Sequence, residues 1–354
     1  MRREGREAGT ADIIPISQAN DAETRTRTND MRGRRTWERR AARRRATAFL
    51  AGALTLASSA STCADEGGTS FWLPGQYASF AGVSPPPGWS IPTELYYYSG
   101  SAPDSASASQ SAAVPAGTQS QSWQLSFSPT YVPATTVLGG QPALFLSFGV
   151  GGNATQADQA SSATPASQTV VGLTDLSPGA SLGWTHGKDY WLVYLVGNIP
   201  VGSYESQRLA NVGIGHAAID TGAAYTHYSA KTGLSLSVGG GFTYNFENYS
   251  TDYRNGIDSH MGWSAMQAVS ANWQLGLAGY VYYQLTGDSG SGNTCGPCKS
   301  RVASVGPQLN YNFTVAGQQW SVNLRGYYEF WAQNRLEGYA VFATLTIPLG
   351  SAKK

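Results

Sequence analysis

The feature that most constrains the fold is a period-two alternation of apolar and polar residues, repeated from about residue 91 to near the C-terminal end. Between residues 234 and 246, the even positions that are not glycine are Leu, Val, Phe or Tyr, and the odd ones are Ser, Thr or Asn. Such alternation places the apolar side chains on one face of a strand. The segments are longer than the roughly five to six residues typical of soluble β-sandwiches. They therefore predict an antiparallel transmembrane β-barrel, with a soluble sandwich as the alternative.

The same pattern divides the chain into twelve strand segments, an even number of the kind that bacterial single-chain barrels have. Aromatic residues near the segment ends, such as Tyr190, Trp191, Trp273 and Tyr283, are typical of interfacial girdles. The expected strands cover residues 91–99, 122–133, 141–151, 175–186, 189–199, 212–229, 232–246, 256–269, 272–286, 300–313, 318–331 and 335–349. We expect an all-β protein of about twelve strands, in which residues 100–121, 152–169 and 287–299 are long loops at the outer end. Tolerated surface insertions are the equal alternative for these loops.

The N-terminal region has the pattern of a secretory signal. A basic cluster at residues 32–45 precedes a short apolar stretch at residues 46–56 and small residues up to Ala64. This order predicts a signal peptide at residues 31–64, cleaved after Ala64 and starting at Met31. Residues 1–30 are then a non-native extension, and the expected location is the bacterial outer membrane.

The charge distribution excludes one class of partner. Residues 65–354 contain 10 basic and 15 acidic residues, a formal net charge of −5, although the whole chain carries +1. A nucleic-acid partner therefore has no electrostatic support. After the signal, no run of 18 apolar residues occurs, so a transmembrane helix is not expected and a membrane location requires a barrel.

Residues 65–90 are too rich in proline and glycine to form a strand, and they precede the barrel of residues 91–354. Their aromatic side chains can occlude a barrel lumen as a plug, because irregular backbone is tolerated where protein or water surrounds it. A leader that only joins the first strand is the equal alternative. If the segment is a plug, we expect Phe71, Trp72 and Trp89 to contact the cargo.

Reactive motifs are few. Cys295 and Cys298 have the spacing of a thioredoxin-type site, but no helix start is readable beside them, so a loop-tip disulfide is favoured. His186, His216, His227 and His260 lack metal-ligand spacing. Neither a nucleophile elbow nor a clustered acid and base is evident, so we expect no metal, no cofactor and no catalysis.

The chain also resembles a bacterial family named for a meta-pathway of phenol degradation. The matching stretches begin with Ser-Phe-Trp-Leu-Pro-Gly-Gln-Tyr at residues 70–77. The others lie at residues 87–89, 197–202, 208–216, 242–248, 251–253, 255–256, 284–290, 299–302 and 306–308. The two cysteines depart from the family pattern, and the chain lacks a terminal aromatic residue. The resemblance implies an outer-membrane channel for hydrophobic or aromatic compounds with an N-terminal plug.

These observations lead to one functional expectation: a barrel in contact with outer-membrane lipid that passively admits small hydrophobic or aromatic solutes. The polar faces of the segments predict the residues that line its interior, namely Gln274, Gln284, Gln308, Asn310, Asn312, Arg325 and Glu329. The alternatives are a structural or adhesion barrel without transport and an outer-membrane enzyme.

Overall fold

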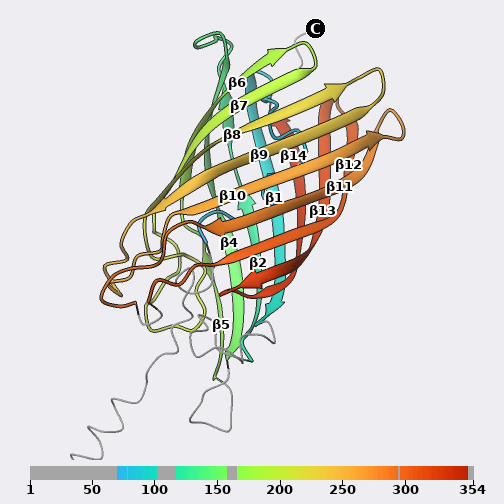
Figure 1. The fold of residues 1–354 in the computed structure, drawn as a ribbon. Helices are drawn as coiled ribbons and strands as arrows, with labels where there is room; N and C mark the ends of the chain where they lie inside the picture. The colour runs from blue at the N-terminus through green and yellow to red at the C-terminus, as the bar shows by residue number, and fades with distance from the viewer. Residues whose placement is uncertain (1–69, 78, 103–116, 158–165, 294–295, 350–354) are drawn as a thin grey trace, which may run out of the picture. The chain divides into compact units, whose positions relative to one another are not determined.

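The alternating segments form a closed antiparallel barrel (Figure 1). The computed structural model describes residues 70–77, 79–102, 117–157, 166–293 and 296–349, all within the unit Ser59–Lys354. The predicted signal peptide and extension lie outside these residues. No helix long and apolar enough to cross a bilayer occurs in the described ranges.

Fourteen strands occur in the described part of the chain, and twelve of them close the barrel because β14 pairs with β1 over 13 residue pairs. The ring follows chain order except that β3 and β5 lie outside it. The strands are β1 (Gly88–Ser101), β2 (Gln119–Phe127), β3 (Thr130–Val132), β4 (Gln141–Ala157), β5 (Ala166–Leu173), β6 (Ser177–His186), β7 (Asp189–Asn198), β8 (Ala218–Ser229), β9 (Leu234–Asn245), β10 (Asp258–Ala268), β11 (Trp273–Gln284), β12 (Arg301–Val315), β13 (Gln318–Gln333) and β14 (Glu337–Leu349).

The prediction of about twelve antiparallel barrel strands is confirmed, and three of the expected segments are corrected. The expected strand 122–133 is divided into β2 and β3, and residues 212–217 precede β8 without forming a strand. Residues 152–169 were expected to be a loop, but β4 continues to Ala157 and β5 begins at Ala166, and the two strands pair. The first half of β4 pairs with β6 and the second half with β5. The missed stretch is Ser-, Ala- and Gln-rich, so its outward positions lack the apolar residues on which the period-two signal depends.

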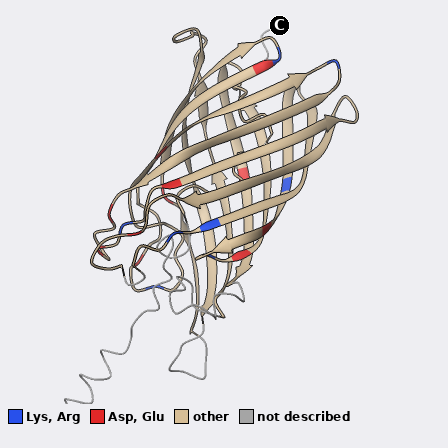
Figure 2. Ribbon diagram, viewed as in Figure 1, with Lys and Arg blue, Asp and Glu red and all other residues tan. Residues whose placement is uncertain are grey.

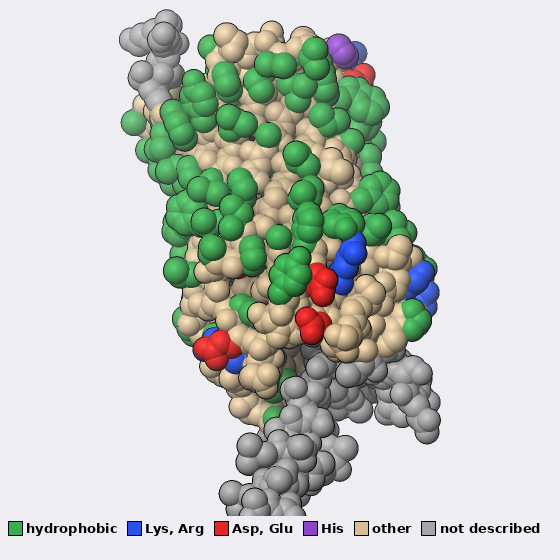
Figure 3. Space-filling view, turned by 90° about the vertical axis from the view of Figure 1, so that its left-hand side faces the viewer, with side chains coloured by type: hydrophobic (Ala, Val, Ile, Leu, Met, Phe, Trp, Pro, Cys, Tyr) green, Lys and Arg blue, Asp and Glu red, His purple; other side chains and the backbone are tan. Residues whose placement is uncertain are grey.

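The apolar positions of the strands face outward. Phe242 is 57% exposed and Leu277 53% exposed, whereas polar neighbours such as Thr243 and Gln274 are buried in the interior. Hydrophobic side chains cover the strands in Figure 3, and charged residues are sparse along the strands in Figure 2. This apolar-out, polar-in arrangement is typical of a barrel that spans a membrane.

Loop lengths differ between the two ends of the barrel. Short turns follow β6, β8, β10 and β12, and glycines with positive φ occupy several of them, including Gly187 at 66° and Gly233 at 71°. The positive φ matches the twist of a tight hairpin turn, which favours glycine. The opposite end has the longer connections after β7, β9 and β11.

The barrel interior is filled by side chains and by the N-terminal segment, which we call the plug segment (residues 70–87). Tyr280, Tyr282, Tyr327 and Phe342 form one buried cluster on β11, β13 and β14. Trp72 of the plug segment packs with Leu192, Tyr194 and Val196 of β7 in another cluster. The plug segment contains no strand before Gly88. Its contacts place the segment against inward-facing side chains of the wall, and its role as a plug stays a prediction.

Candidate functional site

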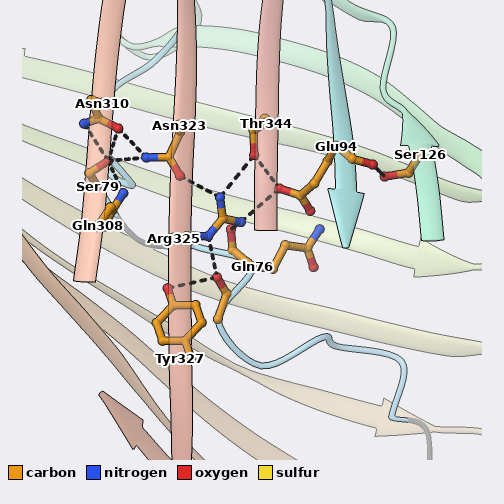
Figure 4. Close-up of polar contacts among 11 residues, drawn as sticks. Gln76, Ser79, Glu94, Ser126, Gln308, Asn310, Asn323, Arg325, Tyr327 and Thr344 are labelled. Carbon is orange, nitrogen blue, oxygen red and sulfur yellow. Dashed lines mark hydrogen bonds and ion pairs between the residues drawn. The ribbon is translucent and has the colours of Figure 1, made fainter. Parts of the chain in front are cut away.

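The plug segment is attached to the barrel wall by Arg325 of β13. The guanidinium Nε donates a hydrogen bond to the carbonyl oxygen of Gly75 at 3.0 Å, and Nη2 donates to the carbonyl oxygen of Gln76 at 2.9 Å (Figure 4). Tyr327 donates from its hydroxyl to the same Gly75 carbonyl at 3.3 Å. The carbonyl groups of this irregular backbone thus accept hydrogen bonds from side chains of the wall, and they need no partner within the plug segment.

A second attachment point is Ser79, on which the side-chain amides of three residues converge. The nitrogen of Gln308 lies 2.7 Å from the Ser79 hydroxyl oxygen, that of Asn310 3.1 Å and that of Asn323 3.4 Å from it. Gln308 and Asn310 were predicted to face the interior. Ser79 was not predicted as a site residue, because no periodic pattern indicates where a side chain points in an irregular segment.

Two backbone amides of the plug segment extend the attachment to the opposite wall. Phe80 donates to the hydroxyl of Ser237 on β9 at 3.0 Å, and Gly82 donates to the hydroxyl of Thr226 on β8 at 3.0 Å. The two hydroxyls also lie 2.9 Å apart and form a hydrogen bond with each other. The plug segment is therefore held on two sides of the lumen.

The tryptophan of the plug segment stacks on a buried histidine that is paired with a carboxylate. The Trp72 ring stacks on His260 of β10 with centroids 3.9 Å apart and an interplanar angle of 10°. His260 Nε2 lies 2.9 Å from a carboxylate oxygen of Asp220, which also accepts a hydrogen bond from Thr243. Because Trp72 is only 5% exposed, its ring belongs mainly to this packing.

A cavity of about 560 Å³ lies between the plug segment and a continuous part of the wall that runs from β12 to β14 and on through β1, β2, β4 and β6 to β7. Its volume is within the range of small-molecule sites. Its apolar lining residues include Phe71, Phe80, Phe145, Val196, Val212 and Ile214. Its polar lining residues include Glu94, Gln124, Ser126, Asn310, Asn323 and Thr344.

The structure divides the predicted lining residues into two groups. Gln308, Asn310, Asn312 and Arg325 line the cavity, as do Phe71 and Trp72 of the plug segment. Gln274, Gln284 and Glu329 face the interior but are buried in other contacts. Gln274 accepts a hydrogen bond from Asn310, Gln284 bonds to Asp288 and Ser300, and Glu329 accepts from the hydroxyls of Tyr98 and Tyr280.

The prediction that Trp89 contacts cargo is wrong. Trp89 is 52% exposed on the outer face of β1, where its ring packs on Tyr131 with centroids 5.0 Å apart. Residues 89–90 already belong to β1, so their side chains alternate between the outer and inner face like those of any wall strand. Trp89 fits an interfacial girdle at the short-turn end.

Cys298 is buried in the loop after β11, and Cys295 lies outside the described residues, so the disulfide between them stays a prediction. Among the residues that the structure describes, no group of three His, Cys, Asp or Glu side chains could hold a metal ion. The cavity contains carboxylates and amides, but the expectation of a protein without catalysis rests on sequence reasoning.

Comparison with one solved structure supports the fold. An outer-membrane channel of the COG4313 group from Pseudomonas putida F1 superposes with a TM-score of 0.59 at 15% identity, covering 78% of this chain and 100% of that one. A FadL homologue from Pseudomonas aeruginosa gives a TM-score of 0.38 at 9% identity, covering 74% of this chain and 90% of that one. No curated protein sequence matches.

The family assignment rests on sequence. The model of the family described as "Putative MetA-pathway of phenol degradation" matches residues 103–345, which extend from before β2 into β14. The match extends over more than half of the chain. The chain therefore belongs to this family.

Proposed function

We propose that this protein is an outer-membrane channel that passively admits small hydrophobic or aromatic compounds. The observation that carries the proposal is the cavity of about 560 Å³, which phenylalanine and aliphatic side chains line together with amides and hydroxyls. Mostly apolar pockets with a few polar groups are typical of small-molecule sites. The long-loop end then faces the outside and the short turns face the periplasm.

The family of this chain and the structural likeness of the chain to an outer-membrane channel support this function. The cleaved signal peptide predicted at residues 31–64 provides the route to that membrane. Solutes cross between the plug segment and the wall, because the cavity lies between them. The plug segment is held there by hydrogen bonds and packing and is not paired with the strands of the wall. No chemical step is needed for this role.

The test is the entry of labelled compounds into liposomes that contain refolded residues 65–354. Initial rates for a monoaromatic compound and a small sugar are compared with those of empty liposomes, which report diffusion through lipid. We expect entry of the aromatic compound above the empty-liposome rate and exclusion of the sugar. Equal entry of both would indicate a general pore, and entry of neither would favour a structural barrel.

A matched pair of variants tests whether the cavity is the route. Ser147 of β4 lines the cavity, whereas its neighbour Leu146 faces lipid and is 38% exposed. Ser147→Trp fills the cavity, so we expect it to reduce aromatic entry to nearly the empty-liposome rate. Leu146→Trp adds the same ring outside the barrel and is expected to leave entry unchanged. Unchanged entry with Ser147→Trp would exclude the cavity as the pathway.

A further inference from the structure

The one guanidinium among the described residues that line the cavity has no donor left for a ligand. Besides Gly75 and Gln76, Arg325 donates from Nη1 to Asn323 at 2.8 Å and to Thr344 at 3.1 Å. Its fifth hydrogen bond runs from Nη2 to Glu94 Oε2 at 2.9 Å (Figure 4). A guanidinium has five N–H donors, so Arg325 is saturated by the protein, and its side chain is only 4% exposed.

Glu94 of β1, by contrast, is partly open to the cavity. Its side chain is 18% exposed, and Oε2 accepts hydrogen bonds from Arg325 and from Thr344, the latter at 2.7 Å. Within the described part of the chain, no donor reaches the other oxygen, Oε1. An ionised carboxylate has room for about four hydrogen bonds, so Glu94 retains acceptor capacity toward the cavity.

The remaining charged residue of the lining, Asp175, is also a carboxylate. Asp175, between β5 and β6, accepts hydrogen bonds from the backbone amides of Gly202 and Ile214 and from the side chain of Asn198. Two carboxylates and one guanidinium therefore line the cavity, a formal charge of −1. Two nearby hydroxyls, those of Ser128 and Ser147, form a hydrogen bond with each other at 2.7 Å.

From this arrangement we infer that Glu94 makes the channel selective for neutral aromatic compounds that donate a hydrogen bond, such as aromatic alcohols, and selective against aromatic carboxylates. The ring packs on the apolar side chains of the lining, and the hydroxyl donates to Glu94. An aromatic carboxylate loses its hydration on entry, meets Glu94 with the same charge, and finds no cation with a spare donor. The inference deepens the proposed function and rests on it.

Binding to the refolded protein in detergent micelles tests the inference, with micelles alone as the calorimetric blank. The probes are benzyl alcohol, benzoate and benzyl methyl ether at pH 7.5, where benzoate is ionised. We expect benzyl alcohol to bind about tenfold more tightly than benzoate and also more tightly than the ether, which lacks a donor. Equal binding of alcohol and benzoate contradicts the inference alone, whereas binding of none of the probes contradicts the proposed function as well.

Glu94→Gln tests the assignment to this residue. The glutamine oxygen can replace Oε2 toward Arg325 and Thr344, which turns its amide N–H groups toward the cavity. We therefore expect the preference for alcohol over benzoate to fall to about twofold or less. The ratio is the readout because loss of the ion pair also loosens the plug segment and changes absolute affinities. Glu94→Asp keeps the charge and is expected to keep the preference.

The matched control is Glu329→Gln, which removes a carboxylate from the same lumen. Glu329 is 1% exposed and does not line the cavity. We expect this variant to retain the wild-type preference, provided that its thermal unfolding shows a folded barrel. If it reduces the preference as much as Glu94→Gln, the net charge of the lumen and not Glu94 is responsible, and the assignment is wrong.

Discussion

At the scale of single residues, Gly75 allows the plug segment to approach the wall. Its φ is 88°, and a Cβ placed on it would lie 2.7 Å from Tyr327 Cε2 and 2.9 Å from Tyr280 Cδ1. Both the left-handed backbone and the close aromatic rings therefore favour glycine. The carbonyl of the same residue accepts the hydrogen bond from Arg325 Nε, so a displacement here also weakens that attachment.

We expect Gly75→Ala to destabilise the docked plug segment by about 1–3 kcal/mol, since strained backbone and overpacking each have costs of this order. Chymotrypsin digestion of the liposome-inserted protein measures the effect as faster cleavage after the aromatic residues of the plug segment. The control is Gly88→Ala, where φ is also positive at 127° but nothing lies within 4 Å of the added Cβ. Equal cleavage of both variants would show that the aromatic contacts do not hold the segment.

Asp288 connects two loops at the long-loop end. It is 5% exposed and accepts hydrogen bonds from the Tyr253 hydroxyl at 2.6 Å and from the Gly256 backbone amide at 2.9 Å. Burial raises the pKa of the Asp288 carboxyl, and the hydrogen bonds from Tyr253, Gly256 and Gln284 offset part of this rise. The folded state therefore holds a proton on this residue more tightly than the unfolded state does.

For an acid with a raised folded-state pKa, the favourable contribution is present at low pH and is lost as the pH rises through that pKa. The thermal midpoint of the wild type relative to Asp288→Asn should therefore fall as the pH is raised from 4 towards neutrality, because asparagine does not titrate. Thermal unfolding of both proteins across this range gives the difference. The control is Asp252→Asn, because Asp252 is exposed and lies in the neighbouring loop. A difference in thermal midpoint between the wild type and Asp288→Asn that does not change with pH would contradict the prediction.

At the scale of elements, the plug segment is the part whose attachment differs from that of the strands. Strands of the wall are held by continuous ladders, such as the 13 residue pairs between β1 and β14. The plug segment is held by side chains that reach it from β8, β9, β12 and β13, and by the stack of Trp72 on His260. It can therefore leave the lumen at a lower cost than any wall strand.

Deletion of residues 70–87 should raise the single-channel conductance of the barrel in planar bilayers, because it removes the backbone that occupies the lumen. Arg325→Lys should give a smaller rise, since an ammonium is a compact charge and lacks the rigid fork that reaches Gly75, Gln76 and Glu94 together. A conductance that does not change on deletion would mean that the segment does not obstruct the pathway.

At the scale of the whole molecule, the outward apolar surface makes the barrel a membrane protein. Leu277 near the middle of β11 is 53% exposed, and its strand neighbours on the same face are Leu275 and Gly279. Tyr249, in the loop after β9, is 85% exposed but lies beyond the strands. High exposure of a hydrophobic residue thus has different meanings in the wall and in the loops, since only the wall contacts hydrocarbon.

We expect Leu277→Arg to lower the stability of the bilayer-inserted protein by about 2–4 kcal/mol, the cost of a basic side chain near the bilayer midplane. Tyr249→Arg should have little effect. Chemical unfolding from liposomes measures both. Similar losses for the two variants would indicate that the barrel is not embedded at the depth that its outward apolar positions imply.

The sequence by itself determined the wall of this protein. Period-two alternation is a local property, so Leu236 and Phe242 could be placed outward and Gln308 and Asn310 inward without knowledge of any partner. It failed at the start of β5, where the outward residues Ser167 and Thr169 are polar and only Val171 and Leu173 are apolar, and at Trp89, which was assigned to the segment before the wall. Both errors lie where a strand extends beyond the region that the apolar pattern marks.

Only the tertiary structure decided what lies inside the wall. The hydrogen bonds that hold the plug segment join residues far apart in sequence, such as Gly75 and Arg325, which are separated by 250 positions. No periodicity relates such residues, because an irregular segment takes its direction from the partners it meets. The same closure of the barrel brings Glu94 of β1 beside Arg325 of β13 and so leaves the cavity with an open carboxylate and a saturated guanidinium.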